Sequence, residues 1–264
     1  MAPMSSDLQH YPPNSAYGTG VYRRRITFTR RADGIDLALL DDYHDMGVTL
    51  TVDGYTITDA AARMDRFPKT SCPGAIAALR ALIGRPVTAL ALSAAERGEQ
   101  CTHLVELARL GLGRLTRDEG SGIVEIALTD RDSSGEQRLA LHRDGKPALA
   151  WVLQDETLVD PAEHRGQSLF GGFIRWVQAA LPPEEADLWR MSQMAVFVAR
   201  GRAYVVDSDR PRRVAEEPAR FAACFSYSSP SFETAFDNTG YVRDFSGGLP
   251  PTRHAASEPA NQGA

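Results

Sequence analysis

The chain has 264 residues, of which 43% are hydrophobic and 24% charged, enough for one large packed domain or two smaller ones. Its formal net charge of −5 argues against a nucleic-acid partner, which would require a basic face. The sequence has no apolar run near the roughly 18 residues that cross a membrane, and its three cysteines are too few for a disulfide framework. We therefore expect a cytoplasmic protein with free thiols, no nucleic-acid partner and no membrane partner.

The ends of the chain have the composition of loose segments: residues 1–20 predict a flexible arm and 246–264 a flexible tail. The basic run Arg23–Arg25 predicts an edge strand with a solvated, charged face. Alternation of apolar and polar residues followed by Asp53-Gly54 is a strong hairpin signal. The first strands are expected at residues 26–28, 36–40 and 46–52.

Helical spacing of apolar residues predicts a helix over 75–83, after Cys72, and another that begins near Thr102. The later elements are strands at 123–129, 138–142, 148–153 and 203–206, and helices at 167–181 and 184–199. Helices and antiparallel strands come in blocks rather than in βαβ alternation, so the predicted fold class is α+β. We expect two such domains, 21–120 and 121–245.

Cys72 and Cys101 are the strongest candidates for chemistry, because each precedes a predicted helix. A thiol at a helix start meets unpaired N–H groups and the positive end of the helix dipole. Both should lower its pKa and make it a better nucleophile or metal ligand. The alternative is a small buried residue that caps a helix. His103 can share a site with Cys101 only if Cys101 lies in the turn before the helix.

His44 lies just before the best predicted strand, where it should face one side of the sheet and Asp45 the other. Two thiols with one or two imidazoles suit a zinc or iron ion or an iron–sulfur cluster. The predicted catalytic residues are Cys72, His44 and Asp45. The predicted metal ligands are His44, Cys72, Cys101 and His103.

Other residues are weaker candidates. Asp42 or Asp53 could serve as a base in place of Asp45. Cys224 is either a buried thiol or a fourth metal ligand. The one-sided aromatic segment that contains Phe170 and Trp176 either belongs to the core or lines an apolar substrate pocket.

The order of elements over residues 40–118 resembles the iron–sulfur scaffold proteins of the NifU/IscU type. Those proteins have a strand hairpin, a Gly-Cys before an Ala-rich helix that ends in Gly-Lys, and a Cys before a Leu-containing helix. The matching segments here are Met46–Val52, Ser71–Ala77, Gly84-Arg85 and Gln100–Leu104. By position, the ligands of that family fall on His44, Cys72 and Cys101. Asp42 replaces the first ligand Cys and Gln100 the last His, so the resemblance implies an altered metal site.

Most of the chain also resembles a bacterial family known only as domain of unknown function 2889. The residues that carry this resemblance are Thr29-Arg30, Asp33-Gly34, His44–Met46, Cys72, Cys101–Leu104, Gly145–Pro147, Trp151, Gly166–Trp176 and Cys224. Proteins of this kind often accompany enzymes that degrade aromatic or acyl compounds, so the resemblance implies a catabolic setting.

The leading hypothesis is a metal-dependent enzyme, of hydrolase or lyase type, that acts on a small acyl or aromatic compound. A three-ligand site would leave a position for water or substrate, and the metal would lower the pKa of bound water or polarise a carbonyl. The alternatives are a non-catalytic metal or iron–sulfur carrier, a metal-free thioesterase or acyl transferase with Cys72 as nucleophile, and a protein whose thiols are core residues. The sequence leaves open the substrate and whether the chain forms a homo-oligomer.

Overall fold

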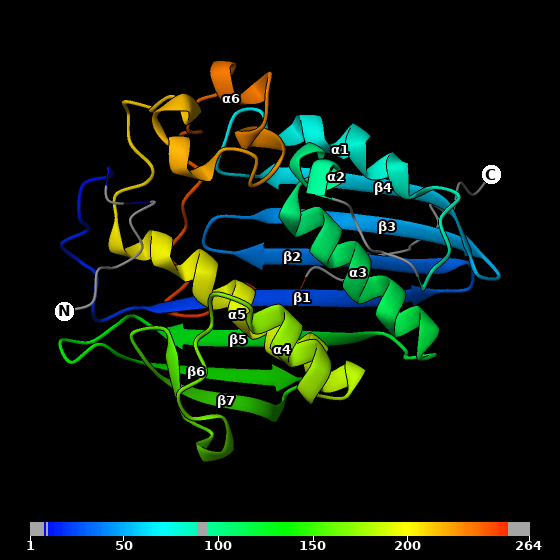
Figure 1. Ribbon diagram of the computed structural model, residues 1–264, viewed down its shortest axis with the longest axis horizontal. Helices are drawn as coiled ribbons and strands as arrows, with labels where there is room; N and C mark the ends of the chain where they lie inside the picture. Colours follow the sequence, from blue (N-terminus) through cyan, green and yellow to red (C-terminus); the bar gives the residue numbers. More distant parts are fainter. Residues whose placement is uncertain (1–7, 9, 89–93, 253–264) are drawn as a thin grey trace, which may run out of the picture.

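The computed structural model describes residues 8, 10–88 and 94–252 (Figure 1). Eight strands form one antiparallel sheet in the order β4-β3-β2-β1-β5-β6-β7-β8. The strands are β1 (Val21–Arg31), β2 (Gly34–Asp41), β3 (Asp45–Asp53), β4 (Thr56–Arg66), β5 (Gly122–Thr129), β6 (Glu136–Arg143), β7 (Lys146–Gln154) and β8 (Thr157–Asp160). The predicted α+β class with antiparallel strands is therefore confirmed.

Helices cover one face of this sheet (Figure 1). The α-helices are α1 (Ala75–Ala78), α2 (Ala94–Glu99), α3 (Thr102–Thr116), α4 (Phe173–Ala180), α5 (Pro183–Ala199) and α6 (Ser231–Thr234). The 3-10 turns are η1 (Cys72–Gly74), η2 (Leu79–Leu82), η3 (Ala162–His164), η4 (Arg200–Ala203), η5 (Val214–Glu216), η6 (Pro218–Arg220) and η7 (Phe225–Tyr227). Helix α3 packs on β2 and β3, and α5 packs on β5 and β6.

Two four-stranded meanders, each followed by helices, share the sheet. They join where β1 pairs with β5, from Val21 opposite Thr129 to Phe28 opposite Gly122. Strand β5 begins at the predicted domain boundary, and the hydrogen-bonded sheet continues across it. The division into two domains remains a prediction.

The core lies between the sheet and the helices because alternate residues of each strand face inward. In the second half, the rings of Trp151 and Trp189 lie 5.0 Å apart and that of Phe173 lies 6.1 Å from Trp151. All three side chains are buried. Phe173, from the one-sided aromatic segment, thus belongs to the core, whereas Phe170 and Trp176 are only partly buried beside it.

The basic run was wrongly predicted to form an edge strand. Strand β1 is central and pairs with both β2 and β5. Arg24 faces the core, while Arg23 and Arg25 bind Ser246 and Glu125. A lone basic residue among alternating apolar ones is thus buried, whereas its two neighbours lie on the other face.

Two other predicted elements are also corrected. The strand expected at 203–206 is absent from the described residues, where η4 ends at Ala203 and Tyr204 makes only an isolated bridge to Pro13. The helix expected over 75–83 is one short α-helical segment between two 3-10 turns. Its apolar residues still pack inward, since Leu79 and Leu82 are buried.

Parts of the predicted arm and tail are packed against the fold. Tyr11 is buried, and its hydroxyl donates to Asp237. The hydroxyl of Ser246 accepts a hydrogen bond of 3.0 Å from the N–H of Val21. The rest of the predicted arm and tail, residues 1–7, 9 and 253–264, lies outside the described residues.

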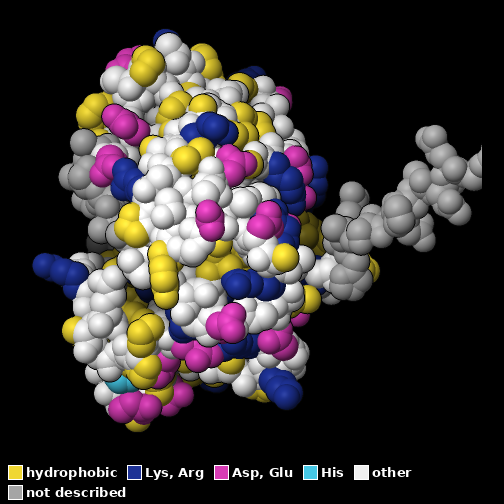
Figure 2. Space-filling view, turned by 90° about the vertical axis from the view of Figure 1, so that its right-hand side faces the viewer, with side chains coloured by type: hydrophobic (Ala, Val, Ile, Leu, Met, Phe, Trp, Pro, Cys, Tyr) yellow, Lys and Arg dark blue, Asp and Glu magenta, His cyan; other side chains and the backbone are white. Residues whose placement is uncertain are grey.

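One face of the described surface mixes charges of both signs. Figure 2 shows Lys and Arg side chains interspersed with Asp and Glu on the right-hand side of the molecule. Among the described residues, no helix combines the length and apolar character that a membrane crossing requires.

Helix α3 approaches the sheet closely at Gly111, where a Cβ would lie 2.6 Å from Leu37 Cδ1 and 3.1 Å from Ile35 Cγ2. We expect Gly111→Ala to lower the free energy of unfolding in urea by up to about 2 kcal/mol, because overpacking of the buried core outweighs the better helix propensity of Ala. Gly113→Ala is the matched control. Its Cβ would meet ends of the Arg117 and Asp187 side chains, which can move, so stability should stay the same or rise by up to about 1 kcal/mol. Equal stability of the two variants would contradict the close approach.

Candidate functional site

Segments that are distant in the sequence meet beside the start of α3. The turn between β2 and β3 contributes His44, and the first turn of α3 contributes His103. Their rings lie 4.2 Å apart, tilted by 35°. The structure therefore brings together the two histidines that the sequence singled out.

Asp41, at the end of β2, organises this cluster. Its Oδ1 accepts hydrogen bonds of 2.8 Å from the N–H groups of Tyr43 and His44, and lies 2.9 Å from His44 Nδ1. Its Oδ2 accepts from the Tyr22 hydroxyl at 2.8 Å and from Arg24 Nη2 at 2.7 Å. A carboxylate can only accept, so His44 Nδ1 carries the proton that it donates.

The Asp41 carboxyl is fully buried and nevertheless ionised. Burial alone would raise its pKa, but the neighbouring His44 and Arg24 outweigh burial and hold the pKa well below its usual value. An imidazole that donates from Nδ1 to a carboxylate presents Nε2 as a proton acceptor or metal ligand. His44 therefore has the arrangement that both kinds of chemistry require.

His103 complements this pair. Burial is the main cause that lowers the pKa of His103 well below its usual value, and the neighbouring His44 and Arg24 lower it further. Its ring is therefore neutral at pH 7. Its Nε2 is buried and has no hydrogen-bond partner. A buried polar atom without a partner is rare in folded proteins and requires an explanation.

The cysteines also come together here, but as thiols. Cys101 is the N-cap of α3 and so lies before the helix, as it must if it is to share a site with His103. The Sγ of Cys72 lies 3.4 Å from the Oγ of Ser226. Burial raises the pKa of Cys72, and it raises that of Cys101 to about 12, with Cys72 and Cys224 adding to the effect. The predicted lowering of these pKa values is wrong, because the loss of hydration destabilises each thiolate more than the helix N-terminus stabilises it. For Cys72 the stabilisation is weak in any case, since η1 is a single 3-10 turn.

The acids predicted from the sequence, Asp45, Asp42 and Asp53, lie outside the contact between Asp41 and His44. Asp45 faces away from His44 and pairs with Arg63 at 2.9 Å, and Asp53 is exposed at the end of β3. Asp42 binds Arg202 at 2.6 Å. Burial raises the pKa of Asp42 to about 6, although Arg202 opposes this shift.

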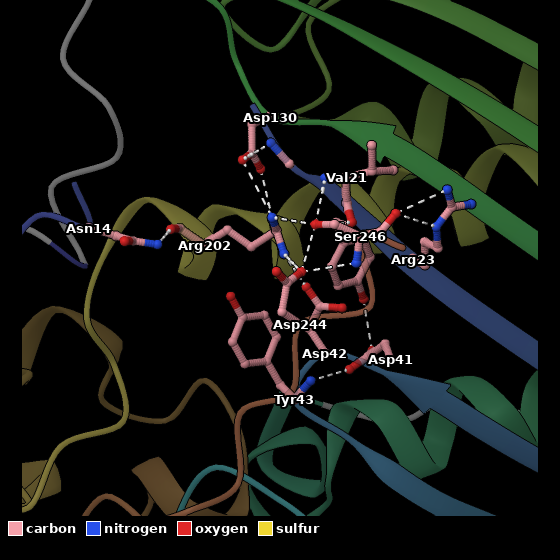
Figure 3. Close-up of polar contacts among 12 residues, drawn as sticks. Asn14, Val21, Arg23, Asp41, Asp42, Tyr43, Asp130, Arg202, Asp244 and Ser246 are labelled. Carbon is pink, nitrogen blue, oxygen red and sulfur yellow. Dashed lines mark hydrogen bonds and ion pairs between the residues drawn. The ribbon is translucent and has the colours of Figure 1, made fainter. Parts of the chain in front are cut away.

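The surroundings of Asp42 explain why Arg202 only partly offsets the effect of burial on the pKa of Asp42. Figure 3 shows Arg202 among several carboxylates, where it binds Asp130 at 2.7 Å and Asp244 at 3.3 Å as well as Asp42. One guanidinium is thus shared, and Asp42 Oδ1 is left buried without a partner. These bonds tie the β2–β3 turn to the end of β5 and to the C-terminal segment.

The predicted metal ligands do not form a ready-made coordination group. Among residues 8, 10–88 and 94–252, no three His, Cys, Asp or Glu side chains are placed to hold a metal ion. A zinc or iron ion, or an iron–sulfur cluster, would require His44, Cys72, Cys101 and His103 to move towards a common point. The contacts among Asp41, His44 and His103 are already in place.

Sequence reasoning missed Arg24, Asp41 and Tyr22. The available signal was alternation: Tyr22, Arg24, Ile26 and Phe28 occupy one face of β1, and all four are buried. An arginine on the apolar face of a strand requires a buried partner of opposite charge. That partner comes from the neighbouring strand, so its identity depended on strand pairing.

We predict that Asp41→Asn lowers the free energy of unfolding by about 3–5 kcal/mol, because the buried Arg24 loses its counter-charge. Asp36→Asn on the same strand is the control. It removes the partner of the more exposed Arg31 and should cost less than about 1 kcal/mol. Chemical unfolding at pH 7 measures both.

The Asp41→Asn variant also tests how the free energy of unfolding depends on pH. The pKa of Asp41 is lowered on folding, so its contribution to stability is present above the unfolded-state pKa of about 4 and is lost as pH falls further. Below pH 4 the wild type should therefore approach the stability of Asp41→Asn. A gap that stays constant down to pH 2 would contradict an ionised Asp41.

Comparison with known proteins adds one finding. No curated protein matches the chain. Residues 29–113 match the model of a family described as "Protein of unknown function (DUF2889)". The matched stretch runs from β1 into α3 and contains Asp41, His44 and His103. This part of the chain is thus similar to the DUF2889 family, which supports the family predicted from the sequence.

Proposed function

We propose that the protein is an enzyme for a small organic substrate, with Asp41 and His44 as its acid–base pair and His103 as a second imidazole beside it. The observation that carries this proposal is the contact of 2.9 Å between His44 Nδ1 and the ionised Asp41 carboxylate. This contact fixes the tautomer of His44 and would stabilise the imidazolium formed when Nε2 takes a proton.

The proposed reaction is of hydrolase or lyase type on an acyl or aromatic compound. In acyl hydrolysis, a water oxygen attacks the carbonyl carbon while the water proton passes to His44 Nε2. The bond to the leaving group then breaks, and His44 returns the proton to that group. In a lyase step, His44 would instead take a proton from the carbon next to the one that holds the leaving group. The C–H electron pair would form a double bond as the leaving group departs with its own bonding pair, and His44 would return the proton to that group. Asp41 remains ionised throughout.

The burial of the cluster supports this chemistry, because charges act more strongly where water is scarce. His44 is 4% exposed, and Tyr43 and Met46 beside it are buried. A metal-free thioesterase or acyl transferase with Cys72 as nucleophile has less support, because burial raises the pKa of this thiol.

A second candidate is a zinc or iron site at the same place, and the buried, unpaired Nε2 of neutral His103 favours it. The ligands would be His44, Cys72 and Cys101, on which the resemblance to NifU/IscU-type scaffolds places them, together with His103. Asp41 would orient His44 as carboxylates commonly orient metal-bound imidazoles. A bound ion would supply Lewis acidity and an acidic water, or the protein would serve as a carrier.

The acid–base proposal is tested with 4-nitrophenyl acetate, butyrate and benzoate as acyl probes. We expect hydrolysis above the uncatalysed rate, and a fall in kcat/KM of at least about 100-fold in His44→Gln, because the proton acceptor is lost. His142→Gln on β6 is the matched control and should match the wild type. A folded His44→Gln variant with full activity would show that His44 does not transfer the proton.

The metal candidate is tested by mass spectrometry of protein made with zinc or iron supplied, without chelator or a His tag. It predicts about one equivalent in the wild type and loss of the metal in both Cys72→Ala and Cys101→Ala. Less than about a tenth of an equivalent in the wild type would exclude this candidate and leave the acid–base proposal standing.

A further inference from the structure

A groove of about 980 Å³ lies between α3 on one side and α4 and α5 on the other. This volume is at the upper end of the range for small-molecule sites. Thr102, Val105 and Arg109 line it, whereas Leu104 and Leu107 of the same helix pack in the core. The groove and the sheet-facing core thus lie on different faces of α3.

Aliphatic side chains form much of the groove wall. They include Val105, Leu112, Ile174, Leu181 and Met194. No aromatic side chain is among the described residues that line it. A wall of this kind fits an extended alkyl chain better than it fits an aromatic ring that would need a stacking partner.

The polar lining has an unequal distribution of charge. Arg109 binds Glu106 at 2.9 Å and Asp187 at 2.5 Å, and Arg117 binds Asp187 at 3.0 Å. The ion pair of Arg190 is a single contact of 3.3 Å with Glu106, which Arg109 already engages. The lining thus contains three arginines and two carboxylates, and Arg117 also binds Glu119 outside the lining at 2.5 Å. Arg190 has the longest ion pair of the three arginines, and it shares that carboxylate with Arg109.

Arg190 also has an unused donor. Its Nε is buried without a hydrogen-bond partner. Burial lowers the pKa of Arg190, the nearby Glu106 opposes this shift, and the positive charge of Arg109 adds to it. A guanidinium stays protonated in proteins, so Arg190 keeps its positive charge while its Nε lacks an acceptor, and Glu106 is its one ion-pair partner among the described residues.

We propose that the groove binds a linear aliphatic carboxylic acid, with its carboxylate on Arg190 and its alkyl chain against the aliphatic wall. The planar guanidinium presents parallel N–H donors that match a carboxylate. The alkyl chain is bound by burial of apolar surface. This site is independent of the Asp41–His44 centre, because it needs no turnover and lies on another face of α3.

Isothermal titration of the full chain with octanoate tests this proposal. We expect saturable binding of octanoate with a Kd below about 1 mM. We expect weaker binding of 1-octanol, which has the same chain length but no charge. Arg190→Gln should weaken octanoate binding at least about tenfold, because it removes the charge that pairs with the carboxylate. Arg131→Gln is the matched control, since Arg131 is as buried as Arg190, pairs with Asp155 and lies outside the groove. The Arg131→Gln variant should bind octanoate with the same affinity as the wild type.

Val105→Glu tests the location of the alkyl chain and keeps the proposal falsifiable if Arg190→Gln fails to fold. A carboxylate on the groove wall should abolish octanoate binding. The proposal is overturned if the wild type shows no binding up to about 10 mM octanoate, or if a folded Arg190→Gln or Val105→Glu variant binds like the wild type. Tighter binding of benzoate than of octanoate would overturn the aliphatic specificity.

Discussion

The buried ion pair between Arg24 and Asp41 is the interaction on which the candidate centre depends. The two residues are 2% and 0% exposed, so each charge is tolerated only because the other is present. The remaining acceptor capacity of Asp41 binds the N–H groups of the following turn. The same carboxylate therefore neutralises Arg24 on β1, fixes the β2–β3 turn and orients His44.

A second cluster of buried charges positions the segment around Cys224, which lies beside the candidate centre. Lys69, after β4, lies 2.6 Å from Glu217 and 2.5 Å from Asp237. These contacts hold the region after α5 against the end of the sheet. There the N–H of Phe225 donates to the Gln100 carbonyl at 2.9 Å, which places the preceding Cys224 near Cys72 and the start of α3. The β2–β3 turn and the segment around Cys224 thus both depend on charges that folding removes from water.

Helix α3 separates two chemically different environments. On its sheet-facing side, His103 and Cys101 are neutral because burial disfavours their charged forms. On its outer side, Glu106 and Arg109 belong to a network of ion pairs that lines an open groove. The first environment suits proton transfer or metal binding, and the second suits recognition of a charged, chain-like ligand. A single amphipathic helix can contribute to both because its faces are separate.

The sequence by itself determined the α+β class, the positions of β2, β3, β5, β6 and β7, and the start of α3 after Cys101. These features follow from local alternation, helical spacing and the order of elements. His44 and His103 were candidates from their local positions, and the tertiary structure brought them together. Only the tertiary structure decided that β1 is central, that Arg24 and Asp41 pair, and that Cys72 and Cys101 stay protonated. Strand order, burial and the partners of a charge arise from residues distant in the chain, and loss of hydration can reverse a pKa shift expected from local structure.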